Sequence, residues 1–551
     1  MFSPSHLLAQ WSEESGGYHL ATGIGYYDIQ PDGQGGIWVA FETIGDVHTY
    51  IQRIDSDGYP VFDAMPGIEI GDGNMNYFVA LQITEEGDAW VAYLDNDQVP
   101  EWEWTIYAQR YQLDGSMVFD STGVLLSESH ETQGRTTLFK MPICSDGAGG
   151  FWLAYYDDFW GNEDEIIAVS GMNADGSYKY EDPLPVRELP RSDEQIELCP
   201  DEEGGVWVIH SEFAGGPTIY NHIDPEGTFL FNEHATCHFA GPDFFHGTST
   251  IPDGEGGCYV SFPGGTSQVE YQRIASDGSL PWSESGISIT DINHATLPSE
   301  IKPRQGGGIV QAVGRGRRSA DLVQILPDGT PALETYETIL DTDSSGYWDG
   351  IPDGICSDGF GGFFCFYRLW NNLEDMEGIR VLRVDCTGDV IWGSDPHINL
   401  RYNPQLSPSH SHMMVVPVEE DHSAVVSVFQ GRQHQLWFYK VRQDGTVAGR
   451  DPSPVQNTPS AQPRRSEILR VYPTPFNSKL HADVQIERPA SYSFRIVNSL
   501  GQTTRQWKQF FPPGSHSLSY SPAPEMVSGV YFLSLSCQDQ LLATKRITLL
   551  K

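Results

Sequence analysis

The residues best suited to hold a ligand are aromatic side chains that stand next to carboxylates. They gather in three segments, DNDQVPEWEW (Asp95–Trp104), DDFWGNEDE (Asp157–Glu165) and LWNNLEDMEG (Leu369–Gly378). An aromatic face stacks on the apolar CH patches of a sugar ring, and neighbouring carboxylates accept hydrogen bonds from the sugar hydroxyls. With one further tryptophan, these segments supply the predicted carbohydrate-binding residues: Trp102, Trp104, Phe159, Trp160, Trp348 and Trp370.

Paired acids in the same segments allow a second interpretation. Glu101 with Glu103, or Glu163 with Glu165, would serve as general acid and general base in glycoside hydrolysis at a suitable separation. The plain alternative is that these aromatic and acidic residues are solvated loop residues packed on strand ends. No nucleophile context such as G-x-S-x-G occurs, and the sequence favours a binding protein over an enzyme.

One basic segment stands out in an acidic stretch of chain. Arg315 and Arg317, in GRGRRSAD (Gly314–Asp321), are predicted to bind an anionic ligand such as a uronate or a sulfate. Guanidinium groups suit that task because they form two parallel hydrogen bonds to such groups. The alternative is that these arginines pair with neighbouring acids of the chain.

A calcium site is the one metal site that the sequence predicts. DTDSSGYWDG (Asp341–Gly350) resembles the start of a calcium-binding loop, and Pro352 stands where such loops carry a bidentate glutamate. A polar loop without metal is the alternative. The candidate Ca²⁺ ligands match loop positions 1, 3, 5 and 9: Asp341, Asp343, Ser345 and Asp349.

A repeated unit must position these segments, because the first 450 residues repeat. An Asp-Gly-Gly turn followed by an apolar strand, as in PDGQGGIWVAF (Pro31–Phe41), occurs in eight copies at spacings of about 51 to 62 residues, the last of them degenerate. A strand that ends in an Asp-Gly turn, as in IQRIDSDG (Ile51–Gly58), follows each copy. Each unit therefore predicts four strands, A to D, and units of this period are typical of β-propeller blades. We expect an all-β protein whose propeller has eight blades.

The N-terminus supplies a missing strand in this scheme. AQWSEESGGYHLAT (Ala9–Thr22) is similar to the D strands of the repeats, and the eighth unit has strands A, B and C only. The N-terminal strand is therefore predicted to complete the last blade and to close the ring, which removes an exposed sheet edge.

Two kinds of connection follow from the four-stranded unit. The A–B and C–D turns are short and alike, whereas the D–A and B–C loops are longer and varied, so the face formed by the D–A and B–C loops is predicted to bind ligand. The recurrent turn aspartates are predicted to bond backbone amides: Asp57, Asp175, Asp277, Asp328 and Asp444. Cysteines in equivalent places before the A–B turn are predicted to pack as small hydrophobic residues: Cys144, Cys199 and Cys356.

Charge separates the chain into two parts. The 551 residues hold 32 Lys and Arg against 75 Asp and Glu, a net charge of −43. Residues 452–551 hold 11 basic and 5 acidic residues, a net of +6, which leaves −49 for residues 1–451. Such an acidic body argues against a nucleic-acid partner, and no apolar run is long enough to span a membrane. We expect a propeller over 1–450, a Pro/Ser-rich linker over 451–466 and a C-terminal domain over 467–551.

The C-terminal part carries four motifs in a fixed order. They are VYPTPFN (Val471–Asn477), RIVNSLGQ (Arg495–Gln502), SGVYFLSL (Ser528–Leu535) and TKRITLLK (Thr544–Lys551). Together they resemble the type A C-terminal sorting domain of type IX secretion cargo, an Ig-like β-sandwich, although Thr474 stands where that family usually has Asn. The resemblance implies these sorting-motif residues: Tyr472, Pro473, Pro475, Asn477, Gly501, Gly529, Tyr531 and Lys545.

The resemblance also implies a route and a location. Cargo of this family is exported by Sec, crosses the outer membrane of a Bacteroidetes-like bacterium through the type IX machinery, and is then released or attached to surface lipopolysaccharide. Residues 1–10 have no basic region and only a two-Leu apolar run, so no Sec signal peptide is expected within this sequence. The expected location is secreted or on the outer-membrane surface.

The function that these observations favour is ligand binding outside the cell. The ligand is a glycan, as the aromatic segments indicate, or a surface protein. The alternatives on the same scaffold are a polysaccharide-degrading enzyme, either a glycoside hydrolase or a lyase, and a structural envelope or adhesion protein. Propellers host all three classes, so the fold alone does not decide between them.

Overall fold

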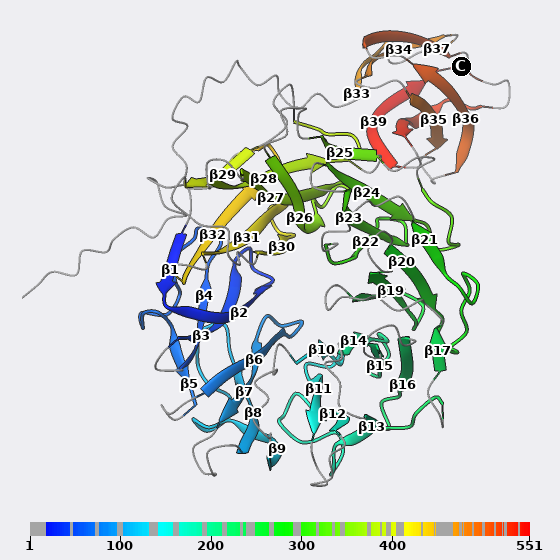
Figure 1. Cartoon of the computed structure of the whole chain (residues 1–551). Coiled ribbons are helices and arrows are strands. Elements are labelled where there is room, and N and C mark those ends of the chain that lie inside the picture. The colour runs from blue at the N-terminus through cyan, green and yellow to red at the C-terminus, as the bar shows by residue number, and fades with distance from the viewer. Residues whose placement is uncertain are drawn as a thin grey trace, which may run out of the picture. The chain divides into compact units, whose positions relative to one another are not determined.

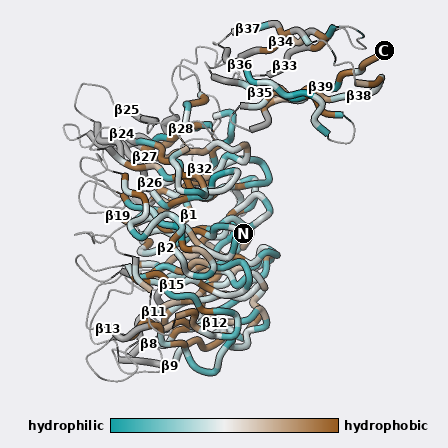
Figure 2. Tube along the Cα trace, turned by 90° about the vertical axis from the view of Figure 1, so that its right-hand side faces the viewer, coloured by the Kyte–Doolittle hydropathy of each residue, from teal (hydrophilic) through white to brown (hydrophobic). Residues whose placement is uncertain are grey.

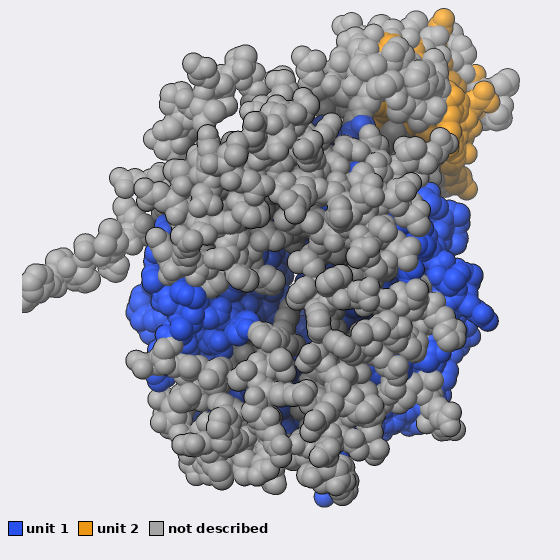
Figure 3. Space-filling view, viewed as in Figure 1, with its two compact units in different colours: residues 1–455 blue, residues 456–551 orange. Residues whose placement is uncertain are grey.

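The structure is a computed structural model of the whole chain. The chain divides into two compact units, residues 1–455 and 456–551 (Figure 3). All regular elements found in the described residues are β-strands, without a helix among them. The described residues are 18–44, 48–71, 76–95, 103–131, 141–157, 165–189, 196–211, 218–231, 235–237, 248–263, 269–289, 299–315, 319–332, 337–341, 348–371, 376–385, 388–392, 398–403, 413–430, 434–445, 447, 467–472, 477, 479–486, 490–498, 502–511, 514–520, 522, 526–537 and 540–550.

A search of the described residues for a helix long and apolar enough to cross a membrane finds none.

The strands of the first unit form eight four-stranded antiparallel sheets within the described ranges. Sheets 1 to 4 are built from β2 (Ile24–Pro31), β3 (Ile37–Thr43), β4 (Thr49–Ile54) and β5 (Ile68–Ile70); β6 (Asn76–Ile83), β7 (Ala89–Asp95), β8 (Glu103–Tyr111) and β9 (Val124–Glu131); β10 (Ile143–Ser145), β11 (Phe151–Asp157), β12 (Glu165–Met172) and β13 (Leu184–Leu189); and β14 (Ile196–Pro200), β15 (Val206–Ser211), β16 (Thr218–Ile223) and β17 (Ala235–Cys237).

Sheets 5 to 8 continue the same order along the chain. They are built from β18 (Ser249–Pro252), β19 (Cys258–Pro263), β20 (Val269–Ile274) and β21 (Ile287–Ile289); β22 (Lys302–Pro303), β23 (Ile309–Arg315), β24 (Ser319–Ile325) and β25 (Glu337–Asp341); β26 (Trp348–Ser357), β27 (Phe363–Asn371), β28 (Met376–Val384) and β29 (Ile398–Asn403); and β30 (Met413–Val418), β31 (Ser423–Gln430), β32 (Gln435–Arg442) and β1 (Tyr18–Thr22).

The first and last parts of this unit meet in sheet 8. Its strand order is β1-β32-β31-β30, and Tyr18 lies opposite Phe438 while Thr22 lies opposite Gln435. The predicted pairing of the N-terminal strand with the last repeat is therefore present for Tyr18–Thr22. Figure 1 shows the sheets of this unit following one another around a ring, which is a propeller-like arrangement.

Eight hydrophobic clusters of this unit each lie between two neighbouring sheets. One cluster joins Trp38 of sheet 1 to Tyr93 of sheet 2, and another joins Phe438 of sheet 8 to Ile37 of sheet 1. A strand inside such a stack is covered on both sides, which explains why all seven residues of β7 are buried. In Figure 2 hydrophobic positions concentrate in the strands, and hydrophilic positions mark the turns at one edge of the unit.

A buried hydroxyl in this core yields a stability prediction. Tyr111 is fully buried, and its hydroxyl has no hydrogen-bond partner among the described residues. Tyr111→Phe removes this unpaired donor, so we expect the free energy of unfolding to stay constant or rise by about 1 kcal/mol. The matched variant is Tyr271→Phe, because the buried Tyr271 hydroxyl donates to Gln311 Oε1 at 2.6 Å.

Urea unfolding of both variants checks this pair. We expect Tyr271→Phe to lose about 1–2 kcal/mol, since it leaves a buried amide oxygen without its donor. A loss of that size in Tyr111→Phe would mean that the Tyr111 hydroxyl is paired after all.

The second unit is made of two antiparallel sheets. One holds β33 (Glu467–Tyr472), β34 (Leu480–Ile486) and β37 (Gly514–Tyr520), and the other has the order β36-β35-β38-β39. Its strands are β35 (Ala490–Asn498), β36 (Thr503–Phe511), β38 (Gly529–Cys537) and β39 (Gln540–Leu549). One core serves both sheets, in which the Trp507 ring stacks between Phe494 and Tyr520 at centroid distances of 5.3 and 5.9 Å.

Candidate functional site

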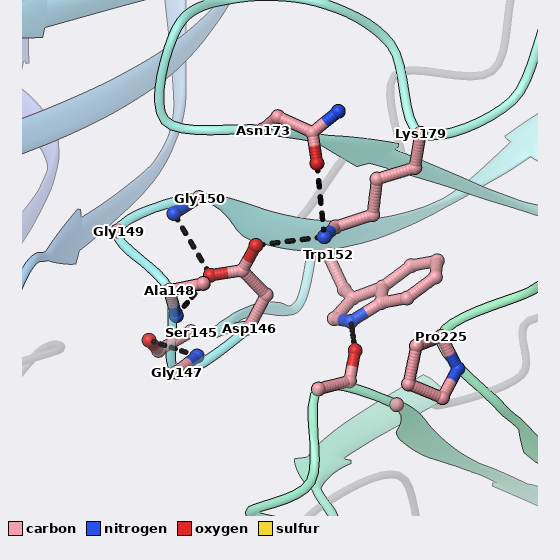
Figure 4. Close-up of polar contacts among 12 residues, drawn as sticks. Ser145, Asp146, Gly147, Ala148, Gly149, Gly150, Trp152, Asn173, Lys179 and Pro225 are labelled. Carbon is pink, nitrogen blue, oxygen red and sulfur yellow. Dashed lines mark hydrogen bonds and ion pairs between the residues drawn. The ribbon is translucent and has the colours of Figure 1, made fainter.

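The A–B turns carry a repeated polar arrangement that we call the turn clasp: a turn acid, a cation and an aromatic ring. In sheet 3, Asp146 Oδ1 accepts hydrogen bonds from the amides of Ala148 and Gly150, both at 2.8 Å. Asp146 Oδ2 lies 2.7 Å from Lys179 Nζ (Figure 4). The carboxylate thus closes its own turn with one oxygen and neutralises a cation with the other.

Tryptophans connect the turn clasps of sheets 1 to 4 to the next sheet. Trp152 lies under the Lys179 ammonium, 5.2 Å from its ring centroid, and its indole N–H donates to the Gly204 carbonyl of sheet 4 (Figure 4). The other bonds of this kind are Trp38 to Gly87, Trp90 to Gly149 and Trp207 to Gly256, and from the fourth-strand side Trp282 to Pro327 and Trp392 to Gln443. The clasp therefore holds neighbouring sheets together.

The cation of the clasp comes from the third strand in most sheets, five residues before the glycine of the C–D turn. Its pairs are Arg53 with Asp32, Arg110 with Asp88, His222 with Asp201, Arg273 with Asp253, Arg383 with Asp358 and Lys440 with Asp421, at 2.6 to 2.9 Å. In register the cation lies opposite an aromatic residue of the second strand in five of these sheets, as Arg53 does opposite Trp38, whereas Lys440 of sheet 8 lies opposite Val425. Cation and ring thus share one face of the sheet.

Sheets 3 and 6 make the contact between the turn residue and its partner with different residues. In sheet 3 the position opposite Trp152 is Gly171, and Lys179 from beyond the turn fills the space that a side chain at Gly171 would occupy. In sheet 6 the roles are exchanged, because Arg304 takes the turn position and donates to Gln324 Oε1 at 3.0 Å. The preserved feature is the hydrogen-bonded contact rather than the residue type.

The clasp explains the repeat motifs as features of the fold. Its acids and cations are largely buried and satisfy each other, so they are not available to a ligand. Sequence analysis did not identify the clasp, although a signal was present: a basic residue recurs five positions before the turn glycine in IQRIDSDG and its equivalents. The recurring turn end of the sheets is therefore structural.

Three of the five predicted turn aspartates bond backbone amides as predicted, one does not, and the role of Asp444 stays a prediction. Asp175, Asp277 and Asp328 each accept the amide two residues on, at 2.9 Å. In the first turn Asp55 rather than Asp57 takes this role, since its Oδ1 accepts from the amides of Asp57 and Tyr59. Asp55 stands at the first position of a tight turn, where Asx side chains most readily reach back to the chain.

These turns make the stability of the protein depend on acid pH. A hydrogen bond from the following Ser or Thr hydroxyl, then one from its amide, lowers the pKa in four turns: Asp114, Asp175, Asp277 and Asp328. A carboxyl with a lowered folded-state pKa stabilises the fold above its unfolded pKa of about 4, and this contribution is lost as the pH falls through the folded pKa.

The test replaces all four of these aspartates by asparagine, which keeps an acceptor oxygen but does not titrate. We expect the Tm of the wild type to fall more steeply between about pH 4 and pH 2 than the Tm of the quadruple variant. Parallel Tm curves over this range would show that the turn carboxyls do not contribute.

Half of the predicted ligand and metal residues lie outside the described residues: Trp102, Phe159, Trp160, Arg317, Asp343 and Ser345. For the other half the structure gives a strand position only: Trp104 in β8, Arg315 in β23, Asp341 in β25, Trp348 and Asp349 in β26, and Trp370 in β27. Their roles therefore stay predictions. Among described side chains, no group of three or more His, Cys, Asp or Glu is arranged to hold a metal ion.

The structure brings some of these positions together in sheet 7. Trp370 lies opposite Asp349 on one side and opposite Glu377 on the other, and Glu377 lies opposite Asn403. This row crosses all four strands at the end where the D–A and B–C loops attach. We call it the sheet 7 row. The strands that carry it are long, with 10 residues in β26 and 9 each in β27 and β28.

Buried acids at the same end of other sheets were missed by sequence analysis. Glu42, Asp95, Glu270 and Asp321 are all buried and lie at or near the loop ends of β3, β7, β20 and β24. Burial raises the pKa of the Glu270 carboxyl. The only signal for them was an acid within an otherwise apolar strand, as in VEYQRI, and single acids of that kind are common in an acidic chain.

Several of the sorting-motif residues are placed in the second unit. Tyr472 ends β33, and Gly529 and Tyr531 lie at the start of β38, where the Tyr531 hydroxyl donates to the Val527 carbonyl at 2.9 Å. Asn477 and Lys545 are exposed. Pro473, Pro475 and Gly501 lie outside the described residues.

The cysteines of the repeats pack as predicted. Cys144, Cys199 and Cys356 are buried free thiols, and so are Cys258 and Cys365 in second strands. For Cys144 and Cys199 desolvation is the first cause of a raised pKa, which keeps these thiols protonated. These five side chains belong to the clusters between sheets.

No family model matches the sequence, and no curated protein matches it. Solved structures that the chain matches include PorZ, a surface component of the type IX secretion system of Porphyromonas gingivalis, with 14% identity and a TM-score of 0.35 over 98% of this chain and 73% of that chain. A Penicillium chrysogenum alpha-L-arabinanase has 12% identity and a TM-score of 0.32, over 66% of this chain and 94% of that one. An Aleuria aurantia lectin has 10% identity and a TM-score of 0.31, over 61% and 96%.

Proposed function

We propose that this protein is a secreted or surface-attached binding protein. Its body is an eight-bladed propeller over residues 1–450, closed by the N-terminal strand, and its ligand binds on the face formed by the D–A and B–C loops. Residues 451–466 are a linker, and residues 467–551 are an Ig-like type IX sorting domain. We propose that the ligand is a carbohydrate. The predicted Ca²⁺ loop, Asp341–Asp349, is proposed to be part of the same face.

The observation that carries the proposed face is the contrast between the two ends of the sheets. At the turn end, the same clasp recurs and its charged groups form ion pairs with each other, as Arg383 and Asp358 do at 2.6 Å. At the loop end, the connections differ in length and sequence from one sheet to the next. Varied connections on a uniform scaffold are where binding residues concentrate.

The sheet 7 row supports the ligand class. Its register places one tryptophan position between two acid positions, with an asparagine position beside them. An aromatic face, carboxylates and an amide are the groups that bind sugar rings and their hydroxyls. Trp348 precedes Asp349 and lies opposite Asn371, so it belongs to the other face of the sheet.

A glycan array tests this proposal on the full-length chain. The array is probed once with Ca²⁺ and once with a chelator, and bound glycans are sorted by class. We expect binding to one class of glycan, weakened by the chelator where the Ca²⁺ loop takes part. An array without signal in both conditions would remove carbohydrate as the ligand and leave a surface protein as the partner.

One observation favours the second candidate, an enzyme on the same scaffold. Glu270 is buried at the loop end of β20, and burial raises its pKa. A raised pKa keeps a carboxyl protonated, as a general acid must be. Incubating the full-length chain with the glycans that it binds tests for turnover. Product release that disappears in Glu270→Gln would support the enzyme, whereas intact glycans after long incubation would support binding alone.

The sorting role of the second unit has its own test. The chain is expressed behind a Sec signal in a bacterium with a working type IX system, with and without residues 456–551. We expect only the longer form to reach the cell surface or the medium. Equal export of the two forms would contradict the proposed role of the second unit.

A further inference from the structure

At two interfaces between neighbouring sheets of the first unit, residues at the same two repeat positions share a hydrophobic cluster. One position lies two residues before a turn acid or its equivalent, and the other directly follows the Gly-Gly pair of the next sheet. Between sheets 3 and 4 these residues are Cys144 and Val206, which share one hydrophobic cluster. Between sheets 5 and 6 they are Ile251 and Ile309, which share another.

Between sheets 4 and 5 both of these positions are cysteines. Cys199 stands two residues before Asp201, and Cys258 directly follows Gly257. Both belong to the cluster that joins the two sheets, with exposed fractions of 1% and 0%. The interface between sheets 4 and 5 therefore has a cysteine at both positions, where the neighbouring interfaces have Cys144 with Val206 and Ile251 with Ile309.

The two thiols are neighbours in this cluster. The Cys199 thiol donates to the Pro200 carbonyl at 3.7 Å, interaction with the Cys258 side chain is, after burial, a cause of its raised pKa, and both cysteines are free thiols in this structure. The backbone next to them is also tied across the interface, because Thr250 Oγ1 donates to the Leu198 carbonyl at 3.3 Å. The strands on both sides are thus held at a fixed separation, which a cross-link needs if it is to form without moving the backbone.

We propose that Cys199 and Cys258 form a disulfide between sheets 4 and 5 when the chain folds in an oxidising compartment. The reaction is thiol–disulfide exchange with an oxidant that carries a reactive disulfide. One cysteine attacks as a thiolate and forms a mixed disulfide; the second cysteine then displaces the oxidant. Two protons and two electrons leave the pair, an S–S bond forms, and the oxidant is reduced to its dithiol.

The bond must form before the interface closes. Attack requires a thiolate, and burial followed by interaction with the Cys258 side chain raises the pKa of the Cys199 thiol in the folded protein. The fully buried pair is also out of reach of a macromolecular oxidant. A chain that has folded in its reduced form therefore stays reduced, and a chain that folds in the presence of the oxidant becomes cross-linked.

The cross-link would close a loop of about 60 residues and join sheet 4 to sheet 5. Its presence in the native cell rests on the proposed export, since the cytoplasm keeps thiols reduced. Its chemistry does not depend on the ligand or on the sorting domain.

The test expresses the full-length chain in two compartments of one host, the reducing cytoplasm and, behind a Sec signal, the oxidising periplasm. Each sample is alkylated under denaturing conditions and digested without reduction, and linked peptides are identified by mass spectrometry. We expect a Cys199–Cys258 linked peptide from the periplasmic sample only. We also expect a Tm about 2–6 °C above that of the cytoplasmic sample.

Cys258→Val is the matched variant, because it recreates the Cys144–Val206 pair of the neighbouring interface and should fold. It should show no linked peptide, and its Tm should be the same from both compartments. Full alkylation of Cys199 and Cys258 in the wild-type periplasmic sample, or a link from either one to another cysteine, would overturn the proposal. Because the host supplies the oxidising compartment, failure here counts against the disulfide and leaves the proposed export untouched.

A second arm tests the order of folding and oxidation. The folded cytoplasmic protein is incubated with oxidised glutathione before alkylation. We expect both thiols to remain reduced. Rapid cross-linking of the folded protein would overturn the claim that the bond forms before the interface closes.

Discussion

Arg383→Met is expected to lower the free energy of unfolding by about 3–5 kcal/mol. The Arg383 guanidinium donates to Asp358 Oδ2 through two nitrogens and to the Gln443 carbonyl of sheet 8 at 2.9 Å. The side chains of Arg383 and Asp358 are 6% and 1% exposed. The variant therefore leaves a buried carboxylate without its cation and removes a bond between sheets 7 and 8, and unfolding by urea measures the loss.

Two further variants separate the clasp from a general effect of charge. Glu300→Gln breaks the exposed pair of Lys302 and Glu300 and should cost less than about 1 kcal/mol. Asp358→Asn combined with Arg383→Met removes both buried charges, keeps an acceptor for the turn amides of Phe360 and Gly362, and should be less destabilised than Arg383→Met alone. A loss below about 1 kcal/mol for Arg383→Met would contradict the structural role of the clasp.

Removal of residues 1–22 is the second change with a large expected effect. It deletes β1, exposes the edge of β32 and uncovers the cluster in which Leu20 contacts the core of sheets 8 and 1. The lost apolar contact and backbone hydrogen bonds together amount to a loss on the order of 3 kcal/mol. The new edge offers unpaired backbone groups to other chains, so we also expect self-association.

The control for this truncation removes residues 1–17 only and leaves β1 intact. Thermal unfolding and light scattering compare both forms with the full-length chain. We expect the shorter truncation to behave as the full chain does, and the longer one to unfold at a lower temperature and to associate. Equal behaviour of the two truncations would show that β1 does not close the ring.

Much of the first unit was predictable because its repeats encode local geometry. The Gly-Gly and Asp-Gly turns fix where each strand starts and ends, and the apolar runs between them show that both faces of the strands are covered. The pairing of Tyr18–Thr22 with β32 was predictable from the count of strands in the last repeat. These features depend on short stretches of sequence, which single-sequence reasoning reads well.

The turn clasp was not predicted, because its parts meet only after the sheets form. Arg53 and Asp32 are 21 residues apart, and the indole bond of Trp38 reaches another sheet. In sheet 3 the position that carries the cation in other repeats is Gly171, and Lys179 supplies the cation from eight residues further on. Aligning the repeats therefore does not reveal Lys179 as the partner of Asp146. The position of Cys199 and Cys258 in one cluster was hidden for the same reason, since the proximity of distant cysteines cannot be read from spacing.

The ligand residues were the least predictable part. Aromatic and acidic residues in long loops indicate a class of ligand, but the loops alone do not show which side chains converge. The sheet 7 row emerged only from strand register, which set Trp370 between Asp349 and Glu377. Register depends on the pairing of three strands, and the sequence of one strand does not contain it.

Glycan binding by three forms of the full-length chain tests the central claim most directly. The forms are the wild type, Trp370→Ala in the sheet 7 row, and Tyr178→Ala, which removes an aromatic residue that is 44% exposed next to the C–D turn of sheet 3. We expect Trp370→Ala to lose about tenfold in affinity, as one lost stacking contact implies, and Tyr178→Ala to bind as the wild type does. Unchanged binding by Trp370→Ala together with lost binding by Tyr178→Ala would place the ligand at the turn end and contradict the central claim.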